Sequence, residues 1–146
     1  MCRMIFPRLL LGAALLPALP VIMPAASAET SWPICGRGKR VTCIVDGDTF
    51  WKDGIKYRLA AVNTPEAGDG ARCGKERHLA DAATARLREL MQIPRLSYYP
   101  QGRDRYGRVL VNIRTHKGDD IASLMVESGY GRPYAGGYHD PHEWCQ

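Results

Sequence analysis

The stretch "RVTCIVDGDTFWKDGIKYRLAAV", residues 40–62, decides the fold because it alternates in polarity and carries two turn signals. It is rich in β-branched and aromatic residues, which favour strands. The turn signals are Asp46-Gly47 and Asp53-Gly54, and such Asp-Gly pairs are typical of tight hairpins. The stretch therefore predicts a three-stranded meander, with strands at about residues 41–45, 49–52 and 56–62.

A loop and a long helix are predicted after this meander. Proline and glycine recur between residues 63 and 74, which is typical of a loop. From Lys75 to Met91 the apolar residues recur at helical spacing, and charged residues cover the opposite face. We expect a helix over this range that ends near Pro94.

Two more strands and a short helix complete the predicted elements. The segments "LSYY" (96–99) and "VLVNIR" (109–114) have the composition of strands. A short helix is expected over "IASLMVES" (121–128), with Asp119 or Asp120 as its cap and Gly129 at its end. The glycine-rich tail predicts irregular structure. Five strands with a helix between the third and the fourth is the order of an OB-type barrel, an order that many small α+β domains share.

The first 28 residues have the pattern of a secretory signal peptide. A basic start is followed by an apolar run and by the small residues "ASA" at positions 26–28. A membrane anchor is the alternative, but prolines interrupt the run, which is shorter than the roughly 20 apolar residues needed to span a bilayer. We therefore expect a signal peptide over residues 1–28 and one domain over residues 29–146. The protein would be exported to the periplasm or the medium, free of the membrane, and monomeric.

Four cysteines remain after the predicted cleavage. In an exported chain an even number of cysteines predicts disulfides, and four cysteines allow three connectivities. A zinc site of four thiolates would need short paired spacings, and none occurs. The pairing that we expect joins Cys35 to Cys145 and Cys43 to Cys73. The first bridge would hold the two ends of the domain together, and the second would tie the first strand to the long helix.

The net charge is compatible with a polyanionic partner but does not decide the function. The whole chain carries a formal charge of +5, and loss of a signal peptide with two arginines and no acid lowers this to +3. Many secreted domains are as basic as this.

Three segments hold most of the residues that suggest chemistry: "DGDT" (46–49), "RLAAVNTPE" (58–66) and "DRYGR" (104–108). Together they offer hard oxygen ligands, a free carboxylate and at least two guanidinium groups. This set suits phosphodiester hydrolysis, because the attacking water needs a base and the developing charge needs arginines and a hard cation. Each segment alone has a simpler interpretation as a turn or a surface ion pair. The hypothesis therefore depends on all three segments together.

With these segments in this order, the sequence resembles the staphylococcal nuclease (thermonuclease) family. The motifs "VDGDT", "RLxxVxTPE", "CGKE" and "DRYGR", followed by "ESGY", extend the resemblance from about residue 41 to residue 134. The resemblance implies an α+β, mainly β fold, a five-stranded OB-fold barrel with about three helices. It also implies an endonuclease that uses calcium to hydrolyse phosphodiester bonds of DNA and RNA.

The resemblance further implies a role for each matching residue. Glu66 would activate water, and Arg58 and Arg108 would bind the phosphate and stabilise the transition state. Three metal ligands are implied: Asp48, Asn63 and the backbone carbonyl of Thr64. Tyr106 is implied to lie beside the phosphate, and Arg105 is a further candidate for binding the substrate. Tyr134 is a candidate for stacking on bases, with packing on the barrel as the alternative.

Asn63 departs from the family pattern, which has aspartate at this position. An amide oxygen can still bind calcium, but one negative charge is lost, and a unit charge pair near a surface is worth roughly 4 kcal/mol at about 4 Å. We therefore expect calcium to bind on the order of tenfold to a thousandfold more weakly. The alternative is a catalytically weak or inactive relative that binds nucleic acid or a protein partner through the same surface.

Overall fold

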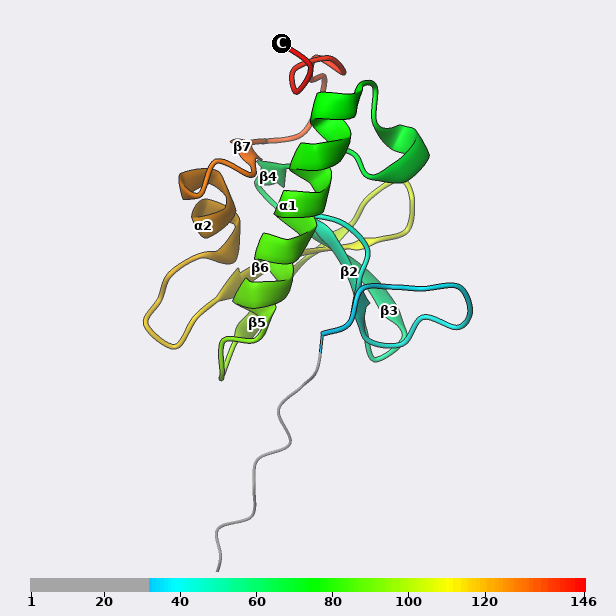
Figure 1. Cartoon of the computed structure of the whole chain (residues 1–146). Helices are drawn as coiled ribbons and strands as arrows, with labels where there is room; N and C mark the ends of the chain where they lie inside the picture. The colour runs from blue at the N-terminus through cyan, green and yellow to red at the C-terminus, as the bar shows by residue number, and fades with distance from the viewer. Residues whose placement is uncertain (1–31) are drawn as a thin grey trace, which may run out of the picture.

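The computed structural model describes residues 32–146 (Figure 1). The predicted signal peptide and the predicted start of the domain at residue 29 lie outside the described residues. Within the described part of the chain, no helix has the length and apolar character needed to cross a membrane.

The predicted meander forms the first part of a five-stranded sheet. Its strands are β1 (Cys43–Ile44), β2 (Thr49–Lys52) and β3 (Ile55–Leu59), which pair antiparallel in chain order. β6 (Val109–Arg114) then pairs parallel with β3, and β5 (Ser97–Arg103) pairs antiparallel with β6. The sheet order is therefore β1-β2-β3-β6-β5.

The third predicted strand is divided into two. β3 ends at Leu59, and Ala61 has a positive φ of 63°, so the chain turns before it forms β4 (Val62–Asn63). β4 pairs antiparallel with β7 (Arg132–Pro133), which lies in the tail that was predicted to be irregular. This second, two-stranded sheet brings the tail beside Asn63.

The α+β class with a majority of strand elements is confirmed. In the described residues the five-stranded sheet is open, with β1 and β5 at its edges, so closure into a barrel stays a prediction. The same part of the chain contains two α-helices, α1 (Gly74–Met91) and α2 (Ile121–Glu127), and a short 3-10 helix, η1 (Gly68–Gly70). Asp120 caps α2, since its side chain accepts a hydrogen bond from the backbone N–H of Ser123.

α1 lies across the sheet and covers its core (Figure 1). Its apolar face, which includes Ala83 and Leu87, packs with fully buried strand residues such as Phe50. The turn after β1 also approaches this helix. A Cβ atom on Gly47 would lie 2.7 Å from the Cβ of Ala83 and 2.9 Å from that of Thr64, so only glycine allows this approach. The helix thereby positions the flanking residues Asp46 and Asp48.

The four cysteines form two disulfides, as predicted, but the predicted pairing was wrong. The bonds join Cys35 to Cys43 and Cys73 to Cys145. The segment before β1 folds back beside it, with the backbone N–H of Cys35 donating to the carbonyl of Ile44 at 2.8 Å, which places Cys35 next to Cys43. The C-terminal tail returns to the first turn of α1, where Cys145 meets Cys73 (Figure 1). Two disulfides are typical of an oxidising compartment.

Candidate functional site

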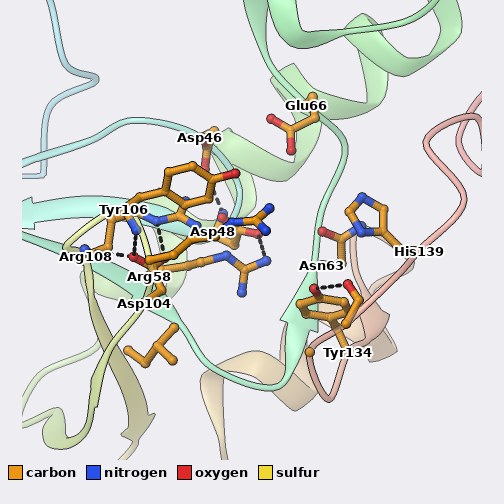
Figure 2. Close-up of a pocket in the computed structure, with 14 residues that line it drawn as sticks. Asp46, Asp48, Arg58, Asn63, Glu66, Asp104, Tyr106, Arg108, Tyr134 and His139 are labelled. Atoms are coloured by element: carbon orange, nitrogen blue, oxygen red, sulfur yellow. Dashed lines mark hydrogen bonds and ion pairs between the residues drawn. The ribbon is translucent and has the colours of Figure 1, made fainter.

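One pocket of about 520 Å³ gathers almost all the residues that the sequence indicated for chemistry (Figure 2). The predicted residues that line it are Asp48, Arg58, Asn63, Glu66, Arg105, Tyr106, Arg108 and Tyr134. Thr64 does not line it, and lies instead in a neighbouring pocket that shares Asn63 and Glu66. Residues from the meander, the loop after β4, the β5–β6 turn and the tail therefore meet in one place.

The pocket also contains residues that the site prediction missed. They are Asp46, Asp104, Leu110, Gly136, Gly137 and His139. Asp46 and Asp104 belong to the "DGDT" and "DRYGR" segments, so the sequence did hold a signal for them. The sequence held no such signal for the tail residues Gly136, Gly137 and His139. They lie at the pocket because β4 pairs with β7 and because Cys73 is bonded to Cys145, contacts that bring the tail to this place.

Arg58 and Asp48 form a buried ion pair on one wall of the pocket. Nη2 of Arg58 lies 3.1 Å from Oδ2 of Asp48, and the two residues are 9% and 7% exposed. Nη1 of Arg58 donates to the carbonyl of Leu59 at 3.0 Å, and the hydroxyl of Thr49 donates to Oδ1 of Asp48 at 2.8 Å. The register of β2 and β3 sets this arrangement, because Thr49 pairs with Arg58. Arg58 is therefore held in place and its charge is balanced by Asp48.

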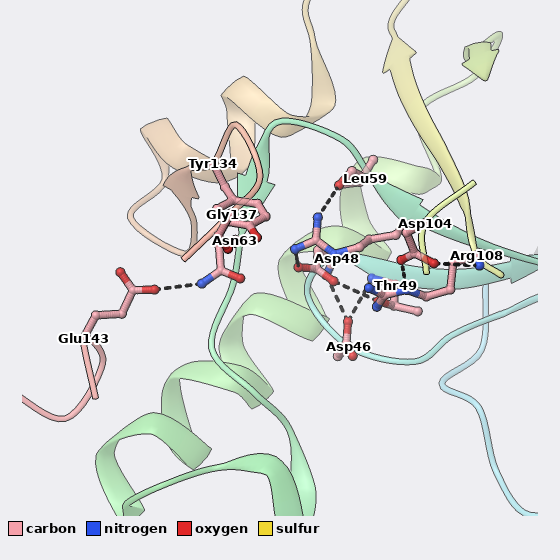
Figure 3. A network of polar contacts seen from close by, with 11 residues as sticks. Asp46, Asp48, Thr49, Leu59, Asn63, Asp104, Arg108, Tyr134, Gly137 and Glu143 are labelled. Carbon is pink, nitrogen blue, oxygen red and sulfur yellow. Dashed lines mark hydrogen bonds and ion pairs between the residues drawn. The ribbon is translucent and has the colours of Figure 1, made fainter. Parts of the chain in front are cut away.

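Arg108 and Asp104 form a second ion pair at the turn between β5 and β6. Nε of Arg108 donates to Oδ2 of Asp104 at 2.7 Å, and the backbone N–H groups of Tyr106 and Arg108 donate to Oδ1. Desolvation opposes ionisation of Asp104, but the hydrogen bonds and charge of Arg108 outweigh it and lower the pKa of Asp104. Nη1 of Arg108 also lies 3.5 Å from the hydroxyl of Thr49. Thr49 therefore contacts both ion pairs, which lie close together in the pocket (Figure 3).

Glu66 presents a carboxylate to the pocket that accepts no hydrogen bond from any residue in the described part of the chain. Desolvation raises the pKa of Glu66, and repulsion from Asp48 and Glu76 adds to this, while Arg58 and Arg108 oppose it. Its backbone N–H donates to Oε1 of the buried Glu76 at 3.2 Å, which holds the loop against α1. Glu66 is thus positioned through its backbone, and its side chain is available to accept a proton.

The oxygen atoms in the pocket fit a hard cation such as calcium. Burial, and then repulsion from Asp48, raise the pKa of Asp46 from 3.8 to about 7. A cation bound among these carboxylates would relieve that repulsion, and carboxylate and amide oxygens are ordinary calcium ligands. A separate group of Cys73, Glu76 and Cys145 is also compact, but its cysteines are bonded to each other and offer no thiolate.

The raised pKa of Asp46 predicts that Asp46→Asn stabilises the metal-free protein at high pH. The unfolded chain ionises this carboxyl near pH 3.8 and the folded chain near 7, so the free energy of unfolding falls as the pH rises through that window. The shift corresponds to an upper limit of roughly 4 kcal/mol at about 1.4 kcal/mol per pKa unit. Both backbone hydrogen bonds to Asp46 end on Oδ1, an atom that asparagine keeps.

Urea unfolding in chelator at pH 4 and pH 8 measures this effect. The variant should lose less stability than the wild type between the two pH values. The exposed Asp69→Asn is the matched control, and it should behave as the wild type does. An equal loss of stability in wild type and Asp46→Asn would contradict the assignment.

Two tyrosines flank the arginines. The Arg58 guanidinium lies 5.4 Å from the ring centre of Tyr134, whose hydroxyl donates to the carbonyl of Gly137 at 2.8 Å. Tyr106 is 68% exposed, with the guanidinium groups of Arg105 and Arg108 at 4.9 Å and 5.4 Å from its ring centre. Aromatic faces beside cations suit a ligand that combines phosphates with flat bases.

Known proteins share this sequence pattern. Residues 56–143 match the family described as Staphylococcal nuclease homologue, a range that contains Arg58, Glu66 and Arg108. The chain is also 34% identical over 124 residues to the succinoglycan biosynthesis protein ExoI of Rhizobium meliloti (strain 1021). The alignment covers 80% of this chain and 59% of that protein, so the chain spans less than two thirds of this relative.

Proposed function

The chain belongs to the staphylococcal nuclease homologue family, and from this premise we propose that it is a calcium-dependent nuclease that hydrolyses phosphodiester bonds of DNA or RNA. The observation that carries the proposal is that Arg58, Glu66 and Arg108, from three separate segments, line one pocket. Family membership also supports an OB-type fold for the open sheet. Nucleic acid is the substrate class that suits paired arginines flanked by tyrosines.

The roles of the three residues follow from their surroundings. Glu66 accepts a proton from the attacking water, and its raised pKa makes the carboxylate a better proton acceptor. Arg58 and Arg108 donate hydrogen bonds to the phosphate oxygens, on which negative charge increases in the transition state. Each arginine is paired with an aspartate in the structure, so the phosphate competes with Asp48 and Asp104 for these donors.

Asp48, Asn63 and the backbone carbonyl of Thr64 are the proposed calcium ligands. When bound, the ion supplies positive charge next to the phosphate and neutralises part of the transition state. The chain's own contribution is to hold hard oxygen atoms on β4 and on the turn before β2. Asp48 and Asn63 line the same pocket, and the neighbouring position of Thr64 suits a ligand that acts through its backbone.

The disulfides and the N-terminal pattern support export. Two disulfides favour an oxidising compartment, and the basic and apolar start of the chain favours a signal peptide over residues 1–28. We propose that residues 29–146 form the mature monomeric domain in the periplasm or the medium.

Incubating the purified protein with plasmid DNA and with RNA, in calcium or in chelator, tests the activity. We expect the nucleic acid to be degraded in calcium and to stay intact in chelator. Degradation at the same rate in chelator would contradict the calcium requirement, and intact nucleic acid in both conditions would contradict the enzyme.

A catalytically weak binding module is the second candidate, and the neutralised arginines favour it. The guanidinium groups of Arg58 and Arg108 are already paired with carboxylates, and Asn63 lacks the charge that the family has. In the plasmid experiment, a shift in DNA mobility without cleavage would support this candidate over the enzyme.

A further inference from the structure

The amide of Asn63 is tied to the C-terminal tail. Asn63 is 6% exposed, and its Nδ2 donates to Oε1 of Glu143 at 2.7 Å, across 80 residues of sequence. Figure 3 shows the amide nitrogen turned to Glu143 and the amide oxygen turned toward Asp48. Within the described residues this oxygen accepts no hydrogen bond, and Asn63 lines the pocket. The oxygen is therefore left for a ligand in the pocket.

Glu143 is itself held in place by several contacts. Its side chain is 14% exposed, with Oε2 at 3.5 Å from Nη1 of Arg132, and Nη2 of Arg132 donates to the Glu143 carbonyl at 3.0 Å. Arg132 pairs with Asn63 in the β4–β7 ladder and lies over the ring of the buried Trp144 at 4.7 Å. The next residue, Cys145, is bonded to Cys73 at the start of α1. Glu143 lines neither pocket but is therefore held in place beside Asn63.

We propose that Glu143 is a positioning residue that holds the amide of Asn63 with its oxygen facing the pocket, where that oxygen binds the cation. The proposal rests on the calcium requirement proposed above. An amide has a donor end and an acceptor end, and half a turn would present the NH₂ group to the ion, which repels it. An ionised carboxylate only accepts hydrogen bonds, so Glu143 can pair only with the NH₂ end. Its negative charge also lies next to the position where the family has aspartate.

The effect of Glu143→Gln should depend on the residue at position 63. In the wild type, glutamine can pair with either end of the Asn63 amide, so it no longer selects one orientation, and a negative charge is lost. In the Asn63→Asp variant, both oxygens of the side chain at position 63 are acceptors, so there is no orientation to select, and glutamine at position 143 removes only a negative charge. The same substitution therefore weakens calcium binding more in the wild type than in the Asn63→Asp background.

Calorimetric titration of calcium into the disulfide-bonded protein measures these effects as a double-mutant cycle. The four proteins are the wild type, Glu143→Gln, Asn63→Asp and the double variant. We expect Glu143→Gln to weaken calcium binding about threefold to tenfold in the wild type, and by a clearly smaller factor in the Asn63→Asp background. Glu89→Gln, an exposed carboxylate on α1, is the matched control and should change neither affinity. A purely structural role of Glu143, or an effect of its charge alone, would weaken binding by the same factor in both backgrounds.

A measurement without metal tests the contact itself. In a ¹H–¹⁵N correlation spectrum, the Asn63 side-chain amide should have one proton shifted downfield by the carboxylate, and Glu143→Gln should reduce that shift. If Glu143→Gln does not fold, Glu143→Asp withdraws the carboxylate by one methylene group and should weaken calcium binding in the wild type. Unchanged amide signals, or an effect of the same size in both backgrounds, would overturn the proposal.

The outcome also separates this proposal from the proposed function. If the wild type binds calcium and cleaves plasmid but Glu143→Gln has the same effect in both backgrounds, only the role of Glu143 is wrong. If the effect is larger in the wild type but plasmid stays intact, the role of Glu143 holds and the nuclease activity is wrong. If the wild type binds no calcium, the calcium requirement and the role of Glu143 are both refuted.

Discussion

Replacing Glu66 with glutamine is expected to lower the rate of nucleic acid cleavage by roughly a hundredfold or more, the usual contribution of a general base. Glutamine has nearly the same shape as glutamate but cannot take a proton from water. The fold should not change, because Glu66 is exposed and its side chain accepts no hydrogen bond from the described residues. Its contact with Glu76 involves only the backbone N–H, which the variant keeps.

Initial rates of cleavage at saturating calcium measure the effect, with thermal unfolding as the check on folding. Glu127→Gln is the matched control, since Glu127 is an exposed carboxylate at the end of α2, outside the residues that line the pocket. The control should cleave at the wild-type rate. A rate for Glu66→Gln close to that of the wild type would remove Glu66 from the mechanism.

Replacing Arg108 with alanine is expected to lower turnover by roughly a hundredfold or more, because one stabilising donor in a transition state is commonly worth about 3 kcal/mol. Arg108 gives a clearer test than Arg58. Arg58 pairs with Asp48 at 9% exposure, so its removal leaves a buried carboxylate without its partner and can cost about 3 to 5 kcal/mol of stability. Loss of activity in an Arg58 variant would therefore not distinguish a catalytic defect from a folding defect.

For Arg108, measuring both kcat and thermal stability separates a catalytic defect from a folding defect. Its side chain is 21% exposed and pairs with Asp104 in a surface turn, so the alanine variant should fold. Arg108→Lys keeps the charge but not the planar fork, and we expect it to be slower than the wild type and faster than the alanine variant. Arg114→Ala, at the other end of β6, is the matched control. A turnover of Arg108→Ala near that of the wild type would contradict the assigned role.

Residue patterns over short distances predicted much of the fold and of the site. β2, β6 and α1 lie where alternation and helical periodicity placed them, and α2 begins at the predicted cap. The residues selected for chemistry meet in one pocket, with Thr64 beside it. The predictions of these helices and strands were confirmed because turns, caps and amphipathic faces depend on neighbours in sequence.

The errors concern contacts between distant parts of the chain. The break between β3 and β4 depends on the left-handed conformation of Ala61, a residue type that does not signal such a turn. The disulfide pairing depends on which cysteines the folded chain brings within bonding distance, and spacing along the sequence did not reveal this. Apart from Tyr134, the tail residues that line the pocket were missed for the same reason.

The sequence by itself determined the class of fold, the chemical character of the site and the position of its one unusual residue, Asn63. These properties depend on residue type and on local order. Only the tertiary structure decided that Asp48 and Asp104 neutralise the two arginines, and that Glu143 reaches Asn63 across 80 residues. The physical reason is that a hydrogen bond or ion pair needs its atoms within about 3 to 4 Å, and only the folded chain sets that distance for residues far apart in sequence.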